Sequence, residues 1–278
     1  MSKEKIDPPK CYGDASKLAA CGNTAQLAVL IEKNAGCVSA TDAVGAVPVA
    51  WAARAGQPGT VQLLLKHESG TNAPSWRHLR PLHHAVNGFY EDVVRELLGR
   101  EETDVDAKDE GGTTALHLAA GRGVVSICQV SRACRGATGA PQANGTRNLC
   151  QAYVQALVDH KANVNAANAS GSTPLHFAAN CGQVSVVTYL ISKVRRGSMQ
   201  RVMLLAAQPL RRRLLQGAHA DAKDSAGNTP LHVAARTGFP AVVKALLAGG
   251  AKATLTNAAG KAPAEVALDA DTVHSLGT

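Results

Sequence analysis

The sequence predicts an all-α protein built from a repeated two-helix unit. Three observations support this prediction: a four-residue pattern ending in histidine recurs along the chain, apolar residues follow it at helical spacing, and the recurrence has a period of about 33 residues. The composition agrees. Apolar residues make up 45% of the 278 residues but aromatic residues only 3%, so the core must consist mainly of Ala, Leu and Val, which favour closely packed helices.

The recurring pattern is Thr-Pro-Leu-His or a close variant of it. Four clear copies and one degenerate copy occur, at Thr114–His117, Thr173–His176, Thr229–His232, Arg80–His83 and Val47–Ala50. Pro48 and Pro81 are separated by one period, and so are Pro230 and Pro263. Self-similarity at a fixed period of this length indicates a repeat architecture, in which each repeat is one supersecondary unit.

Each part of the repeat has a physical reason. Thr at the start of the pattern can cap a helix N-terminus, and the missing N–H of the next residue, Pro, costs nothing there. The Leu and the following Ala-Ala form a narrow apolar face, and Val242-Val243 with Leu246-Leu247 form the apolar stripe of a second helix. Gly238 tolerates the positive φ that ends the first helix, and Asp or Asn followed by Gly, as in 224–227, marks a turn. One repeat is therefore a hairpin tip, a helix, a turn and a second helix.

These motifs resemble the ankyrin-repeat family over nearly the whole chain. The resemblance implies an ankyrin-repeat solenoid of about seven helix-turn-helix units with short hairpin tips, in a single domain over residues 14–278 that follows a disordered tail at 1–13. We expect the units near residues 14–45, 46–79, 80–112, 113–171, 172–227, 228–260 and 261–278. Because no unit can bury its apolar face alone, stability requires stacking of neighbouring units.

Two irregular inserts interrupt the period. The intervals from His117 to His176 and from His176 to His232 exceed one period by about 26 residues and about 23 residues, respectively. Removing residues 194–216 restores a repeat of normal length, whereas removing the other insert, near 125–151, leaves its repeat one residue short. Two hypotheses stay open. In the first hypothesis the inserts are translated introns, because both begin with Val and end with Gln, whose codons fit splice sites. In the second they are disordered excursions of the chain, which cost about 0.6 kcal/mol per doubling of loop length.

The positive charge of the chain lies in these inserts. The net charge is +8, but the inserts carry nine arginines and no acidic residue or lysine, which leaves −1 for the repeats. A nearly neutral repeat body argues against binding to a phosphate backbone, so we expect no nucleic-acid partner. An alternative stays open, in which the Arg-rich insert near 194–216 binds a membrane, calmodulin or a nucleic acid.

The remaining sequence features bear on compartment and chemistry. Residues 1–10 are polar and charged with no apolar run behind them, and the seven cysteines lack the spacing of a zinc site or the density of a disulfide scaffold. We therefore expect a cytoplasmic protein, with the nucleus as the alternative, and no cofactor. No motif for nucleophilic catalysis or phosphate binding occurs, so we expect no enzymatic activity.

The histidines of the pattern suggest a metal ladder, but stacking keeps equivalent atoms apart, whereas metal ligands must converge on one point. The resemblance implies instead that the Thr and His side chains form hydrogen bonds within and between units. The residues concerned are His83, Thr114, His117, Thr173, His176, Thr229 and His232.

The resemblance also implies a partner-binding groove, lined by the hairpin tips and the first helix of each unit. We expect a monomeric, non-enzymatic scaffold or adaptor that binds a partner protein, with no small-molecule substrate and no membrane partner. In the alternative, this chain is the targeting part of a larger regulatory or ubiquitin-ligase complex. Trp76, in the irregular polar stretch 69–78, is the expected anchor, and Trp51 is assigned to the core. The candidate contact residues are Arg54, Trp76, Asn87, Tyr90, Glu110, Thr113, Arg122, Ser170, Ser172, Asn180, Ser225, Asn228, Arg236 and Thr237.

Overall fold

The computed structural model describes residues 14–67, 70–121, 143–200 and 218–277. These residues form α-helices, short 3-10 helices and loops, and none of them forms a β-strand, so the all-α prediction is confirmed. The chain divides into two compact units, Met1–Glu110 and Gly111–Thr278. The single domain and the disordered tail at residues 1–13 stay predictions, because the tail lies outside the described residues.

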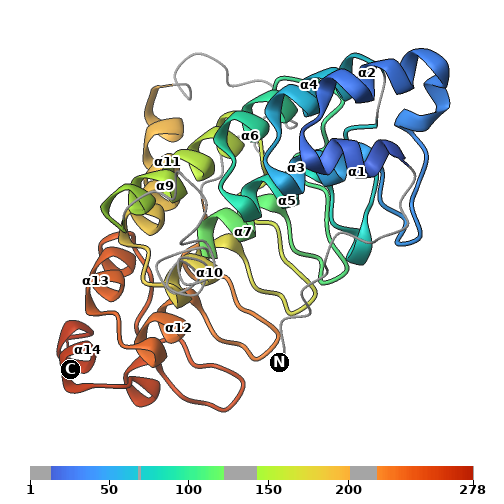
Figure 1. Ribbon diagram of the computed structural model, residues 1–278. Coiled ribbons are helices and arrows are strands. Elements are labelled where there is room, and N and C mark those ends of the chain that lie inside the picture. Colours follow the sequence, from blue (N-terminus) through green and yellow to red (C-terminus); the bar gives the residue numbers. More distant parts are fainter. Residues whose placement is uncertain (1–13, 68–69, 122–142, 201–217, 278) are drawn as a thin grey trace, which may run out of the picture. The chain divides into compact units, whose positions relative to one another are not determined.

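The unit Met1–Glu110 contains three helix pairs arranged as two rows (Figure 1). The first helices pack side by side, and so do the second helices, while each first helix also packs on its own second helix. The first helices are α1 (Asp14–Cys21), α3 (Pro48–Ala55) and α5 (Pro81–Gly88), and the second helices are α2 (Thr24–Lys33), α4 (Pro58–Lys66) and α6 (Glu91–Leu98). Two 3-10 helices, η1 (Ala35–Val38) and η2 (Trp76–His78), lie between successive pairs.

The unit Gly111–Thr278 repeats this arrangement (Figure 1). Its first helices are α7 (Ala115–Gly121), α10 (Pro174–Asn180), α12 (Pro230–Thr237) and the 3-10 helix η4 (Pro263–Val266). Its second helices are α9 (Ala143–Asp159), α11 (Val184–Gln200), α13 (Pro240–Ala248) and α14 (Ala270–Ser275). The last pair is the shortest, with a 3-10 helix in place of the first α-helix.

The core of each unit is built from small and medium apolar side chains, as the composition predicts. The leucines of the recurring pattern are buried, for example Leu116 and Leu175, which are completely inaccessible to solvent. The Ala pairs that follow are buried as well, for example Ala234 and Ala235. Because alanine methyl groups occupy these positions, neighbouring first helices can approach closely and bury the apolar face that a single repeat would expose.

The recurring Thr and His side chains link each repeat to the next in the unit Gly111–Thr278. The Thr229 backbone N–H donates to His232 Nδ1 at 3.2 Å, and Thr229 Oγ1 lies 2.9 Å from the same nitrogen. Since Nδ1 accepts a hydrogen bond, the proton is on Nε2, which donates to the Lys261 carbonyl at 3.0 Å. His117 and His176 make the same contacts, to the carbonyls of Ser172 and Asn228.

The hairpin tips stack on one another through their backbones. Asp224 Oδ1 accepts hydrogen bonds from the backbone N–H groups of Ala226 and Asn228, at 3.0 and 2.8 Å, which fixes the turn. The Ala258 N–H of the next tip then donates to the Ala226 carbonyl at 3.0 Å. The tip glycine, Gly227, has a φ of +72° and lies directly against this neighbouring tip.

The second insert leaves the repeat geometry unchanged on both sides. The Ala218 N–H donates to the Leu190 carbonyl at 3.3 Å, as the Ala251 N–H does to the Leu246 carbonyl at 3.0 Å in a repeat without an insert. Leu190 and Ala218 are 28 residues apart in the sequence (218 − 190), whereas Leu246 and Ala251 are 5 residues apart (251 − 246). The segment between Leu190 and Ala218 is therefore longer by 23 residues (28 − 5). That difference equals the length of the predicted insert, residues 194–216.

Part of each insert is helical, which differs from the irregular structure expected. Helices α9 and α11 contain 17 residues each, against 8 in α6 and 9 in α13, and they extend into the inserts over residues 143–151 and 194–200. Continuing an existing helix avoids the cost of nucleating a new one, and Arg, Met and Gln in residues 194–200 are good helix formers. The remaining insert residues, 125–142 and 201–216, lie outside the described residues.

The stacked tips predict different costs for two glycine substitutions. In Gly227→Ala, the new Cβ would lie 2.6 Å from the Ala258 nitrogen, whereas Gly260, with a similar φ of +73°, has no neighbouring atom within 4 Å. Gly260→Ala should lower the free energy of unfolding by about 1 kcal/mol, which is the cost of the left-handed backbone. Gly227→Ala should lower it by about 3 kcal/mol in urea unfolding. Equal losses would contradict stacking of the tips.

The linking histidines predict that stability falls with acidification. Burial lowers the pKa of both His176 and His232 in the folded protein. Below the unfolded-state pKa of about 6.5 the unfolded chain therefore binds more protons than the folded chain, which favours unfolding. The contribution of the two neutral histidines to the free energy of unfolding is fully present above about pH 7. It is lost as the pH falls below the unfolded-state pKa of about 6.5 toward the lower folded-state pKa values.

Urea unfolding at pH 7.5 and pH 5.5 tests this expectation, with a lower midpoint at pH 5.5. The double variant His176→Gln and His232→Gln is the control, because glutamine does not titrate. It should be less stable than the parent protein but show a smaller change between the two pH values. A midpoint that stays constant or rises on acidification would contradict the proposed protonation state.

Deletion of residues 194–216 tests the closed turn formed by Leu190 and Ala218. The deletion joins Lys193 to Gly217 in a repeat of normal length, so the helical circular dichroism per remaining residue of the repeats should be retained. Stability should stay constant or rise by about 1 kcal/mol, because a shorter loop costs less closure entropy. Loss of cooperative unfolding in the deletion variant would show that these residues are required for the fold.

Candidate functional site

The first helices and the hairpin tips of each unit lie on the same side of the helix pairs, and we call this side the inner face (Figure 1). The second helices form the opposite side of the pairs, which we call the outer face. Several side chains of the tips and of the last turns of the first helices are exposed, for example those of Ser225 and Arg236. The inner face therefore combines a backbone fixed by stacking with exposed side chains.

In the unit Gly111–Thr278, four predicted contact residues are exposed: Ser170, Asn180, Ser225 and Arg236. Asn180 and Arg236 occupy the last turns of α10 and α12, and Ser225 lies at a hairpin tip. Thr113 is half-buried just before α7. Arg122 lies outside the described residues, so its predicted contact role stays a prediction.

Four predicted contact residues of this unit have internal roles. Thr237 Oγ1 donates to the Val233 carbonyl at 2.8 Å, and Ser170 Oγ donates to Asn168 Oδ1 at 2.9 Å. The carbonyls of Ser172 and Asn228 accept the hydrogen bonds of the linking histidines. These residues shape the inner face, but their polar groups contribute at least in part to the stability of the fold.

In the unit Met1–Glu110, the predicted contact residues differ in position. Arg54, Asn87 and Glu110 are exposed on the inner face, the first two in the last turns of α3 and α5 and the third at a tip. The ring of Tyr90 instead covers Gly56 and Gly88, where any Cβ would collide with it. The structure therefore places Tyr90 in the packing between two repeats.

Trp76 lies at a hairpin tip that keeps two backbone hydrogen bonds of the other tips. The Ser75 N–H donates to the Leu79 carbonyl at 2.8 Å and the His78 N–H donates to the Ser75 carbonyl at 3.0 Å. Asp42 and Asp224 form the same two bonds at other tips. The backbone of the Trp76 tip still differs from those tips, because both Arg77 and His78 have a positive φ, of 59° and 58°, where the tips of Asp42 and Asp224 have a single Gly at positive φ.

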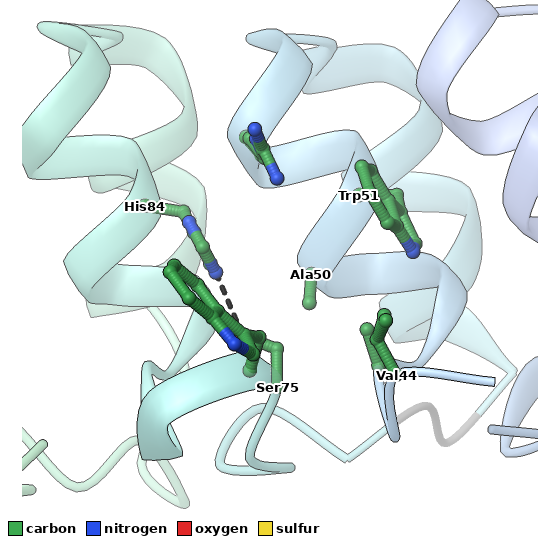
Figure 2. A pocket seen from close by; sticks show the side chains of 8 residues that line it. Val44, Ala50, Trp51, Ser75 and His84 are labelled. Atoms are coloured by element: carbon green, nitrogen blue, oxygen red, sulfur yellow. Dashed lines mark hydrogen bonds between the residues drawn. The ribbon is translucent and has the colours of Figure 1, made fainter. Parts of the chain in front are cut away.

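A pocket of about 210 Å³ opens on the inner face between two successive repeats of this unit (Figure 2). One side consists of α3 and its preceding tip, and the other consists of α5 and the tip that carries Trp76. The lining residues are Val44, Ala46, Ala50, Trp51, Arg54, Ser75, Trp76 and His84. Figure 2 shows Val44, Ala50 and Trp51 across the pocket from Ser75 and His84. Most of the lining is apolar.

The two tryptophans of the chain both line this pocket but differ in exposure. Trp51 is only 8% exposed, and its Nε1 donates to Asp42 Oδ2 at 2.5 Å, so its ring is fixed in one orientation. Trp76 is 44% exposed at the edge of the pocket. Trp51 therefore belongs to the core, as the sequence predicts, and also presents a surface to the pocket.

His84 supports the side of the pocket opposite Trp51. Ser75 Oγ donates to the Leu79 carbonyl and lies 2.8 Å from His84 Nε2, so the Nε2 proton is donated to Ser75. Burial, together with the positive charges of Arg54 and His83, lowers the pKa of His84 to about 4. His84 is therefore neutral at neutral pH and acts as a hydrogen-bonding residue that joins α5 to the tip.

Two arginines stack on the tryptophan rings. The Arg54 guanidinium carbon lies 5.1 Å from the Trp51 ring centroid, and the Arg77 guanidinium carbon lies 4.4 Å from the Trp76 ring centroid. Both distances are within the range of a cation–π interaction, which restricts the arginine without neutralising its charge. In the described part of the chain, neither arginine forms an ion pair with an acidic side chain.

The described residues contain neither a group of metal ligands nor a membrane-spanning helix. Among them, no three His, Cys, Asp or Glu side chains are grouped as metal ligands. No helix of the described segments has both the length and the apolar character required to cross a bilayer. Sequence reasoning missed Val44, Ser75 and His84 as site residues. Aligning Ser75 with Asp42 at the repeat period would have identified the tip that forms one side of the pocket.

Comparison with known protein families agrees with the repeat pattern. Three family models match, described as "Ankyrin repeats (3 copies)" over residues 15–109, "Ankyrin repeats (many copies)" over 150–191 and "Ankyrin repeat" over 226–258. The matches fall along most of the chain and leave out most of the first insert and all of the second. The chain belongs to the ankyrin-repeat family, whose fold generally serves protein–protein interaction.

Curated relatives share the repeats but are much longer. Rabankyrin-5 of Homo sapiens is 28% identical over 218 residues, which are 77% of this chain and 16% of that protein. The Neurogenic locus notch homolog protein 1 of Xenopus tropicalis is 28% identical over 160 residues, 58% of this chain and 5% of that protein. The chain thus spans a small part of each relative.

Solved structures show the same fold. The ankyrin-repeat domain of Bcl-3, described as a unique member of the IkappaB family, superposes with a TM-score of 0.69 at 21% identity, covering 96% of this chain and 98% of that one. The human ASB11 ankyrin-repeat domain gives a TM-score of 0.67 at 20% identity, covering 95% and 96%. Identities this low establish the fold alone.

Proposed function

We propose that this chain is a non-enzymatic scaffold or adaptor that binds a partner protein through the inner faces of its two units. The observation that carries the proposal is the exposure of Trp76 and Arg54 on the inner face of one unit and of Arg236 on that of the other, supported by tips and helices whose backbones are fixed by stacking. Tryptophan and arginine are the residue types that most often contribute binding energy at protein interfaces.

The stacked backbone supports binding without rearrangement. Successive tips are joined by backbone hydrogen bonds, such as Ser225 N–H to the Ser170 carbonyl at 2.9 Å, and successive repeats by the histidine links. A surface that is ordered before binding loses little conformational entropy when a partner docks. The inner face can therefore use a few exposed side chains efficiently.

The proposal extends to the oligomeric state and the compartment. We infer a monomer that acts in the cytoplasm, with the nucleus as the alternative. The scattered spacing of the seven cysteines supports a reducing compartment, because small secreted domains usually carry cysteines at the spacing and density of a disulfide framework. Fluorescent tagging of the full-length protein in its native cells tests the compartment.

Capture of partner proteins from a native cell extract tests the proposed function. The inner-face variant combines Trp76→Ala with Arg236→Glu, which changes one exposed residue in each unit. The matched control combines Val29→Ala on α2 with Lys244→Glu on α13, which removes one exposed apolar side chain and reverses one positive charge on the outer face. Because all four side chains are exposed, both variants should remain folded, as circular dichroism can verify.

We expect the inner-face variant to lose the specific partners by about tenfold or more in quantitative mass spectrometry, because removing interface anchors of this type typically costs over ~1 kcal/mol. The outer-face control should retain them. Equal retention by both variants, or loss only in the outer-face control, would contradict the proposal.

A further inference from the structure

We infer that the pocket between Trp51 and Trp76 binds a short acidic segment of the partner protein, which inserts one bulky apolar side chain and places carboxylates against Arg54 and Arg77. This inference rests on the proposed function and specifies the chemistry of the partner. It depends on the size, the apolar lining and the charge of the pocket.

The size of the pocket fits one side chain. Its volume of about 210 Å³ is smaller than the roughly 300–1,000 Å³ of pockets that enclose small-molecule ligands. The opening lies on the inner face between two tips, where a bound chain can continue in both directions. A side chain projecting from a peptide is therefore a better match to this pocket than a free metabolite.

The apolar lining favours a large hydrophobic group. Val44 and Trp76, at the two tips, remain 40% and 44% exposed, although removing such apolar side chains from water is favourable. Trp51 and Ala50 form the adjoining surface and are almost completely buried. An aromatic or large aliphatic side chain between them would cover this exposed apolar area, and an aromatic ring could also pack edge-on against the tryptophans.

The charge at the edge favours carboxylates. Arg54 lies on the α3 side and Arg77 on the tip side, and each is held over a tryptophan ring without an acidic partner in the described residues. The nearby carboxylate of Asp42 is already engaged, since it accepts hydrogen bonds from Val44, Ala46 and Trp51. Carboxylates on either side of the inserted side chain would form charge-assisted hydrogen bonds with the two arginines.

A nucleic acid strand would also combine stacking groups with negative charge, but the surrounding charge disfavours it. Residues 14–110 carry 13 acidic residues against 9 lysines and arginines. Binding of a phosphate backbone depends on an extended positive surface, which this balance does not provide. The same excess of acid also opposes an acidic peptide, but less strongly, because a peptide carries one or two carboxylates that Arg54 and Arg77 can pair, whereas a nucleic acid strand carries a charge on every phosphate.

Intrinsic tryptophan fluorescence can test the inference directly, because both tryptophans of the protein line the pocket. The probe is the blocked peptide Ser-Gly-Asp-Phe-Glu-Gly-Ser, titrated into the full-length protein, with calorimetry as a second measurement. Two further peptides serve as controls: one with Ala in place of Phe, and one with Lys in place of Asp and Glu. A short single-stranded oligonucleotide tests the nucleic-acid alternative.

We expect saturable binding of the Phe-containing acidic peptide, and binding weaker by about tenfold or more for each control peptide. Arg54→Glu and Trp76→Ala should each weaken binding of the acidic peptide to a similar extent. Lys244→Glu is the control for charge reversal, because Lys244 is exposed on α13 and lies on the outer face. It should bind the acidic peptide like the parent protein.

The inference is overturned by any of four results. These are no saturable binding of the acidic peptide, binding that does not change in Arg54→Glu or Trp76→Ala, equal binding of the Lys-containing peptide, or tighter binding of the oligonucleotide. Its failure is distinguishable from failure of the proposed function. If the inner-face variant loses its captured partners while the parent protein does not bind the acidic peptide, the scaffold function stands and only the partner chemistry is wrong.

Discussion

The structure depends on the fact that one repeat cannot bury its own apolar face, so its stability comes from its neighbours. In the unit Gly111–Thr278, this dependence has a polar counterpart in the hydrogen bond from each linking histidine to the carbonyl of the next repeat. Each imidazole must be neutral to accept from its own Thr and donate from Nε2. Packing and protonation state are therefore coupled along the stack.

This coupling separates the residues that form the fold from those available for binding. The linking histidines, the Ala pairs and the tip glycines Gly112, Gly171 and Gly227 contact the adjacent repeat and have little freedom to change. Exposed residues such as Trp76 at a tip and Arg236 in the last turn of a first helix carry no such constraint. Variation can therefore change the binding surface without changing the stack, which is why this fold serves different partners.

The inserts show how much interruption such a stack tolerates. Leu190 and Ala218 form their hydrogen bond across the whole second insert, because each repeat contacts mainly its neighbours and not the loop that joins its helices. The same local character explains why α11 can extend to Gln200 beyond the length of α13. Whether residues 194–216 are encoded by an exon is a separate question, which the mature transcript answers.

The sequence by itself determined the helices, the period and the core, because these follow from local and periodic features: Pro at helix starts, buried Leu and Ala, and Gly at positive φ. Only the tertiary structure decided the site. Ser75 takes the place of the usual Asp or Asn at one tip, where Arg77 and His78 both have a positive φ, and Tyr90 packs on two glycines. The pocket joins Trp51 to Trp76 and His84 across two repeats. Such contacts arise from the stacking of side chains from different repeats, which no single repeat pattern specifies.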